Sequence, residues 1–166
     1  MSSSTQAATA APPDSADATL AAVETALLSK RRAEAAILAF ATDWADLHPA
    51  ESISAVTGAP PLPGGEAARR LGGEGTPEVA EFAPAELAVS LEQHPLAARH
   101  LMADALDLRH RLPGLWHLVT HELVLECWVA RKIARATRPV SPRQAQEIDD
   151  NWSRWPPTYR RAGRSP

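Results

Sequence analysis

The sequence has one cysteine, few aromatic rings and no long apolar run, and each shortage excludes a class of protein. Cys127 alone cannot form an internal disulfide or a multi-cysteine metal site, and a lone cysteine fits a reducing compartment. The longest purely apolar run, Ala35–Ala41, falls far short of the roughly 20 residues that a membrane-spanning helix needs. The N-terminus has no apolar stretch behind a basic flank, so no signal peptide is expected. We therefore expect a cytoplasmic protein without a membrane partner.

The composition favours one globular domain that is rich in helices. The chain has 166 residues, of which 45% are hydrophobic and 22% are charged, and this length suits a single core. Alanine is frequent, whereas there are only two phenylalanines and one tyrosine. Small side chains of this kind suit close contact between helices.

Apolar residues recur at helical spacing, which predicts an all-α fold: an irregular multi-helix bundle with one long N-terminal helix and disordered ends. Residues 1–14 lack the apolar surface that would offset the entropy of ordering, so we expect disorder there. A long helix is predicted over 15–48, followed by a Pro/Gly-rich loop over 49–76. The residues expected on the buried face of the long helix are Leu20, Val23, Leu27, Leu28, Ala35, Leu38 and Trp44.

Further helices are predicted over 77–150, and the sequence shows no alternation of period two that would indicate a strand. Thr76-Pro77 resembles the start of a helix reaching about Glu92, with Pro84 as a kink or break. His94-Pro95 starts the next helix, and Pro113-Gly114 ends it at a corner. Two helices follow, over about 115–121 and 124–137. Ser141 and Gln144 form a capping box for a last helix that reaches about Trp152. An irregular tail is predicted for residues 151–166.

The stretch ALDLRHRLPGLW combines core-like leucines with charged residues. Ala97, Leu101, Ala105, Leu108 and Leu112 recur every three or four residues and are expected to form a buried face. On that basis the charged side chains between them are expected to point outward, namely Asp104, Asp107, Arg109 and Arg111.

Charge is distributed unevenly, which raises the question of nucleic-acid binding. The net charge is −3, but residues 131–166 carry nine basic and three acidic side chains. Residues 85–100 resemble a helix-turn-helix, with Arg99 and His100 at the start of its second helix. A second basic group lies on ARKIARATRP. The candidate DNA contacts are therefore Arg99, His100, Arg131, Lys132, Arg135 and Arg138; a packed helix pair and a solvated basic helix end are the structural alternatives.

No other residue pattern indicates catalysis. His117 and His121 lie one helical turn apart, but the order of residues is not HExxH and no third clustered ligand follows, so no metal is predicted. Cys127 has no adjacent basic group and is expected to be a small core residue. LGGEG lacks the Lys-Ser/Thr of a phosphate-binding loop and is interpreted as a flexible connector. We predict no catalytic residue and no cofactor.

Four segments together resemble a known family. GGEGTPEVAEF (Gly72–Phe82), AELA (Ala85–Ala88), DALDLRHRLPGLW (Asp104–Trp116) and WVARKIARATRPVSP (Trp128–Pro142) are similar to the 13E12 repeat family, also called domain of unknown function 222. The resemblance covers about residues 18–150. This sequence departs from the family at Glu92-Gln93-His94 and near His121-Glu122, where a glycine is usual.

The resemblance implies a helical region that usually precedes an HNH endonuclease domain, whose chemistry lies in the HNH module. No HNH-like segment occurs in this sequence, so no catalytic residue carries over. We expect either a non-catalytic helical module that engages DNA beside an HNH nuclease domain, or a truncated remnant of such a protein with out-of-frame translation from Asn151. The alternative is a structural or protein-interaction domain that binds itself or another protein without nucleic acid.

Overall fold

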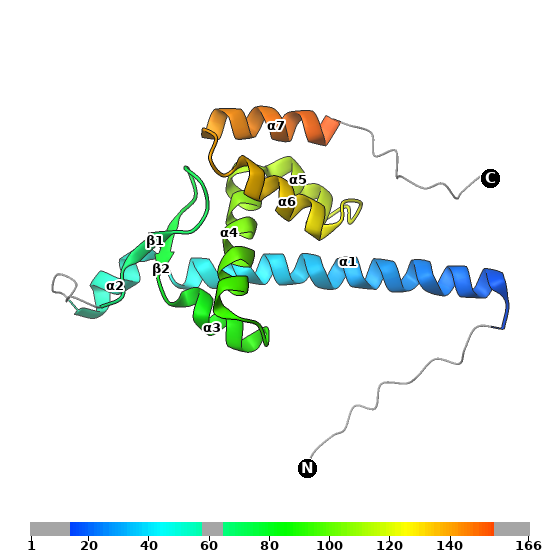
Figure 1. Ribbon diagram of the computed structural model, residues 1–166, viewed down its shortest axis with the longest axis horizontal. Helices are drawn as coiled ribbons and strands as arrows, with labels where there is room; N and C mark the ends of the chain where they lie inside the picture. The colour runs from blue at the N-terminus through cyan, green and yellow to red at the C-terminus, as the bar shows by residue number, and fades with distance from the viewer. Residues whose placement is uncertain (1–13, 58–64, 155–166) are drawn as a thin grey trace, which may run out of the picture.

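The computed structural model describes residues 14–57 and 65–154, which form a helical body with one long helix projecting from it (Figure 1). The described elements are α1 (Ala16–Leu47), α2 (Ala50–Thr57), β1 (Ala68–Arg70), β2 (Glu78–Ala80), α3 (Ala83–Ser90), α4 (Pro95–Arg111), α5 (Pro113–Thr120), α6 (Cys127–Thr137) and α7 (Pro142–Arg154). The all-α prediction is confirmed. The disorder predicted for 1–14 falls outside the described residues except at Asp14, and most of the predicted irregular tail also lies outside them.

Helix α1 confirms the predicted long N-terminal helix, but its buried face is half as long as expected. The Ser15 hydroxyl accepts a hydrogen bond from the Ala18 amide and caps the start, and His48 follows the last residue. Only the second half of the helix packs on the body, through Ala35, Leu38, Ala41, Thr42 and Ala45. The predicted core residues of the first half are exposed to solvent instead: Leu20, Val23, Leu27 and Leu28.

The segment predicted as a Pro/Gly loop contains regular structure, which corrects that prediction. Helix α2 occupies its start, and β1 pairs antiparallel with β2 in the register Arg69 to Val79. The predicted helix over 77–92 is also wrong at its start, because residues 78–80 form β2 and the helix begins only at Ala83. Pro84 lies in the first turn of α3, where its missing N–H costs no helical hydrogen bond, and so it marks a beginning and not a kink.

Helix α4 is the centre of the body, since other elements surround it. Every residue from Leu101 to Leu108 is buried. One side of α4 packs against α1 and α3, and another side packs against α6. Ala97, by contrast, is exposed. The sequence showed one leucine face, and the charged positions of this helix were therefore predicted to be exposed to solvent. A helix that is enclosed on several sides has no solvent-exposed face along its middle.

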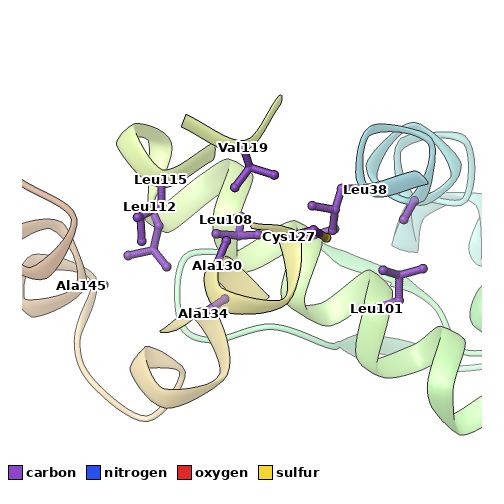
Figure 2. Close-up of a cluster of buried hydrophobic side chains, with 12 residues drawn as sticks. Leu38, Leu101, Leu108, Leu112, Leu115, Val119, Cys127, Ala130, Ala134 and Ala145 are labelled. Carbon is purple, nitrogen blue, oxygen red and sulfur yellow. The ribbon is translucent and has the colours of Figure 1, made fainter. Parts of the chain in front are cut away.

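The core consists of two clusters that share α4. The larger joins the second half of α1 to α4, α5, α6 and α7, and includes Leu38, Leu108, Leu115 and Ala134 (Figure 2). The smaller lies between α1, β2, α3 and α4 around Met102 and Leu106. Many of these side chains are alanines, as the composition predicted, so the helices approach closely.

The C-terminal helices are held by two polar caps. Ser141 and Gln144 form the predicted capping box of α7, with the Ser141 amide donating to Gln144 Oε1 at 3.1 Å. Asp149 of α7 accepts hydrogen bonds from the Gly114 and Leu115 amides at 2.7 and 2.8 Å. It thus caps the N-terminus of α5 from another helix, and this contact fixes the Pro113-Gly114 corner.

Candidate functional site

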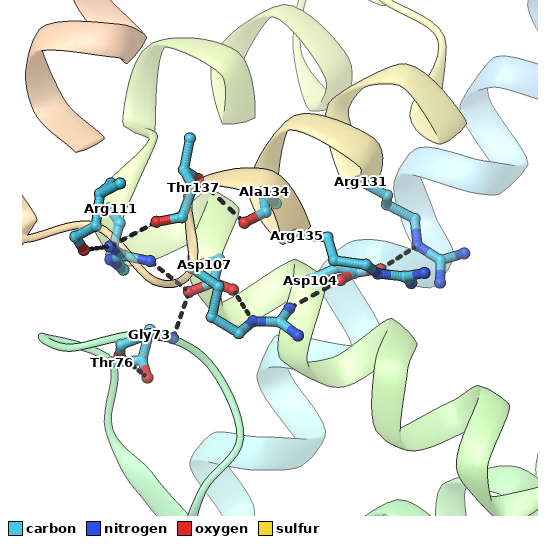
Figure 3. A network of polar contacts seen from close by, with 11 residues as sticks. Gly73, Thr76, Asp104, Asp107, Arg111, Arg131, Ala134, Arg135 and Thr137 are labelled. Carbon is cyan, nitrogen blue, oxygen red and sulfur yellow. Dashed lines mark hydrogen bonds and ion pairs between the residues drawn. The ribbon is translucent and has the colours of Figure 1, made fainter. Parts of the chain in front are cut away.

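Two aspartates on α4 form the base of a buried ion network that gathers three of the six candidate DNA contacts (Figure 3). Asp104 is fully buried and accepts hydrogen bonds from Arg131 Nε at 3.0 Å, Arg135 Nη2 at 3.0 Å and Arg138 Nη2 at 2.9 Å. The prediction that Asp104 points outward is therefore wrong. Its carboxylate stays in the interior because three guanidinium groups satisfy it, two from α6 and one from Arg138, which follows the last residue of α6.

Asp107 lies one turn further along α4 and joins three parts of the chain. It accepts hydrogen bonds from Arg138 Nε at 2.7 Å, Arg111 Nη1 at 3.2 Å and the Gly73 amide at 2.7 Å. Arg111 is itself buried and donates through Nη2 to the carbonyls of Thr137 and Val140. The outward positions predicted for Asp107 and Arg111 are wrong, whereas Arg109 does lie at the surface, where it pairs with Asp46.

The glycine-rich segment is a docked loop and not the flexible connector that the sequence suggested. A Cβ atom on Gly73 would lie 2.6 Å from Arg111 Cζ and 2.7 Å from the Arg138 carbonyl oxygen. A Cβ on Gly72 would lie 2.8 Å from Asp107 Oδ1. Thr76 is buried and its hydroxyl donates to the Gly73 carbonyl oxygen. Glycine is required here because the loop backbone lies directly against the ion network.

The network explains how segments far apart in the sequence come together. The Gly72 loop, the Asp104–Trp116 segment and the Trp128–Pro142 segment, each part of the family resemblance, all contribute to it. Sequence reasoning missed the aspartates, although a signal was present. Asp104 and Asp107 are three residues apart, and Arg131, Arg135 and Arg138 are spaced by four and three, so each set lies on one helical face.

The remaining candidate contacts lie at the surface. Lys132 Nζ lies 5.9 Å from the ring centroid of Trp128, one turn earlier on α6, within the range of a cation–π contact. Arg99 and His100 are exposed near the start of α4. His100 is one turn before Asp104, and thus on the side of α4 that faces α6. Among Arg131, Arg135 and Arg138, the side chain of Arg135 is the most exposed, at 55%.

Helices α3 and α4 pack against each other and are joined by a tight turn, as the helix-turn-helix pattern requires. His94 caps α4 by accepting a hydrogen bond from the Leu96 amide. Glu92 has a φ of 51°, a left-handed backbone that favours glycine. Leu123 has a φ of 56°. Both residues are in the segments where this sequence lacks the glycine that is usual in the resembled family.

The His117–His121 pair and Cys127 are the other residues whose chemistry the sequence raised. The rings of His117 and His121 stack with centroids 4.9 Å apart, and His117 Nε2 lies 3.6 Å from Glu122 Oε1. In residues 14–57 and 65–154, no three His, Cys, Asp or Glu side chains gather into a group that could hold a metal ion. Cys127 is buried as predicted, and burial raises the pKa of its thiol to about 11, which disfavours the nucleophilic thiolate.

The first half of α1 exposes several large apolar side chains. We call Ala16–Ser29 the arm; every residue in it except Ala18 is exposed. Its large apolar side chains form the arm stripe, whose exposed fractions are 63% for Leu20, 58% for Val23, 41% for Leu27 and 38% for Leu28. In Figure 1 the arm, in blue, extends beyond all other helices. It is anchored at its base, where Lys30 and Arg31 pair with Glu126 of the α5–α6 connection at 3.2 and 2.6 Å.

A groove of about 330 Å³ opens where the arm meets the body. Its lining residues come from α1 and from α5 and its C-terminal connection: Arg32, Ala35, Ala36, Ala39, Trp116, Thr120, His121 and Leu123. Three alanines form the α1 side, so a second backbone can approach closely. Among the described residues Arg32 forms no ion pair, so its charge stands unneutralised at the rim.

Comparison with models of known protein families, with curated proteins and with solved structures finds no match. Within the two described ranges, no helix has both the length and the apolar character needed to cross a bilayer.

Proposed function

We propose that this chain is a non-catalytic helical docking module that associates with another polypeptide through the arm of α1. One observation carries the proposal: the apolar face that packs on the body in the second half of α1 continues, unpartnered, along the first half. At about 100° per residue, Leu20 and Leu27 fall on the same side of the helix as the buried Leu38 and Ala45. The arm therefore has the apolar residues of a buried helix on one side, but none of the body packs against them.

The energetics of the arm favour a partner. A solitary helix of about 14 residues is marginal in water, because helices of this length depend on tertiary packing of an amphipathic face. Complete burial of a leucine or valine side chain is worth about 1.5–3 kcal/mol, and the four residues of the arm stripe leave roughly half of their surface in water. A partner that covered the arm stripe would stabilise the arm, and burial of this apolar surface would contribute to the free energy of binding.

Site-specific photo-crosslinking in the producing cells tests this proposal. A photoreactive phenylalanine analogue at Leu20 or Leu27 should give a discrete covalent adduct, and the matched position Val89, which is 80% exposed on α3, should give none. The adduct at position 20 should disappear when Leu27 is changed to Glu, because a buried charge opposes docking. Equal labelling at Val89, or no adduct at either arm position, would rule out the arm as a docking surface.

Engagement of DNA is the second candidate, and the arginine network is the observation that favours it. Its four arginines and two aspartates carry a net charge of +2, and Arg135 remains half exposed beside the exposed Lys132. Buried carboxylates hold these guanidinium groups in fixed positions, which suits contact with phosphates. The same contacts also serve as ordinary structural ion pairs between α4 and α6.

A DNA mobility shift at several salt concentrations distinguishes contact with DNA phosphates from a purely structural role of the ion pairs. Phosphate contacts would make affinity fall steeply with salt, and each lost contact would lower the slope of log K against log salt by about 1. Lys132→Ala and Arg99→Ala are the variants of choice, since neither residue belongs to the buried network. Absence of binding at low salt would leave the docking module as the function. Under the family resemblance, which is itself a proposal, the partner would be an HNH nuclease domain that this sequence does not contain.

A further inference from the structure

We propose that the occupant of the arm stripe is the arm of a second copy of this chain, running antiparallel, with the first turn of each α1 seated at the groove of the other. This inference rests on the proposed docking function and names its partner. Figure 1 shows why two copies can meet in this way: the arm projects from one end of the body, so antiparallel arms overlap while the two bodies lie at opposite ends.

The charges of α1 support the antiparallel direction. The only charged residues in the first ten of the helix are the acidic Asp17 and Glu24, and the next charged residues are the basic Lys30, Arg31 and Arg32. If the two arms cross midway between Glu24 and Thr25, Asp17 of one copy lies level with Arg32 of the other. Both side chains project on the same side of the arm stripe, and in an antiparallel pair like sides face one another.

The groove supplies the place where the first turn of the partner ends. It lies just beyond the arm on the side of α1 that carries Leu28, about a quarter of a turn around the helix from the line of Leu20 and Leu27. Its α1 side of Ala35, Ala36 and Ala39 leaves room for a backbone, and Arg32, which also lines the groove, has no ion-pair partner among the described residues. Asp14 and Asp17 precede or begin the partner's helix and are both exposed, so they can supply the opposite charge.

A parallel pair fits these residues less well. It would bring Asp17 next to its own symmetry mate and Arg32 next to its own, and like charges at that spacing repel. It would also place the two bodies side by side at one end, and neither groove would receive a helix terminus. The antiparallel pair has one unfavourable contact, Glu24 near Glu24 of the other copy. Glu24→Gln is therefore expected to tighten the pair about threefold.

Sedimentation equilibrium of the purified full chain up to about 200 µM tests the inference. The expected result is a monomer–dimer equilibrium that Leu27→Glu weakens by at least about a hundredfold. Asp17→Arg and Arg32→Asp should each weaken it by about tenfold, and the two changes combined in one chain should restore it. Val89→Glu, on an exposed residue away from the arm, should leave the equilibrium unchanged. Circular dichroism confirms that each variant keeps its helix content.

Each outcome separates this inference from the proposed function. A dimer that Leu27→Glu breaks but the single charge changes do not weaken would overturn the antiparallel pairing. A chain that stays monomeric over the whole concentration range would overturn the second copy as occupant, while a cellular adduct of a different polypeptide at Leu20 would preserve the docking function. If the cellular adduct is also missing, both fall.

Discussion

Asp107→Ala should destabilise the protein strongly, because it removes the acceptor at the centre of the buried network. The substitution deletes hydrogen bonds from Arg138 Nε, Arg111 Nη1 and the Gly73 amide. It also leaves Arg111, which is 3% exposed, without a carboxylate. Breaking a buried ion pair on one side costs about 3–5 kcal/mol. Because Arg111 keeps the carbonyls of Thr137 and Val140, we expect a value near 3 kcal/mol.

The assay is urea unfolding followed by circular dichroism at neutral pH, with two comparison variants. Asp46→Ala removes a carboxylate from an exposed pair with Arg109, and should cost under about 1 kcal/mol. Asp107→Leu combined with Arg111→Met replaces both charges with apolar groups, and should be milder than Asp107→Leu alone by about 2 kcal/mol. If Asp107→Ala costs no more than Asp46→Ala, the network does not hold α4, α6 and the glycine loop together, and the reasoning fails.

Four further predictions follow from single contacts. Gly73→Ala should lower the free energy of unfolding by about 2–3 kcal/mol in urea, because its Cβ meets fixed atoms, whereas Ala at the neighbouring exposed Glu74 should be neutral. Glu92→Gly should raise the melting temperature through a gain of about 0.5–1 kcal/mol at a left-handed position, and Glu92→Ala should not. Cys127 should react with a thiol reagent at pH 8 only as the protein unfolds, since its thiol pKa is about 11; rapid labelling of folded protein would contradict the burial. The hydrogen bond from Arg31 lowers the pKa of Glu126, so its stabilisation is present above the ordinary 4.5 and is lost as pH falls through the lowered value. The difference in stability between the native chain and Glu126→Gln, under about 1 kcal/mol at pH 7, should therefore shrink in acid.

Local sequence signals predicted the elements whose ends are set by local chemistry. The start of α1 follows from the Ser15 cap, and the start of α7 follows from Ser141 and Gln144. The body of α4 and its end before Pro113 were likewise readable, because proline cannot continue a helix. These signals involve residues a few positions apart, so the sequence displays them directly.

Features that depend on distant neighbours were predicted wrongly. The exposure of Asp104 depends on whether α6 packs over it, and the burial of Leu20 depends on how far the body extends along α1. Thr76 was expected to cap a helix, but it turns its hydroxyl to the Gly73 carbonyl in the docked loop. The DNA contacts proposed from the sequence stay a prediction, and three of them now have a structural role through Asp104.

The contact between α4 and α6 is lined by alanines, including Ala105, Ala130 and Ala134, and such a smooth surface would allow the two helices to slide. The buried charged groups prevent α6 from sliding along α4. A shift of α6 by one turn, about 5.4 Å, in either direction would carry the carbonyl oxygens of Thr137 and Val140 away from Arg111 Nη2, and would leave that buried guanidinium with Asp107 as its remaining partner. An interface that tolerates many alignments by shape is thus limited to one by electrostatics.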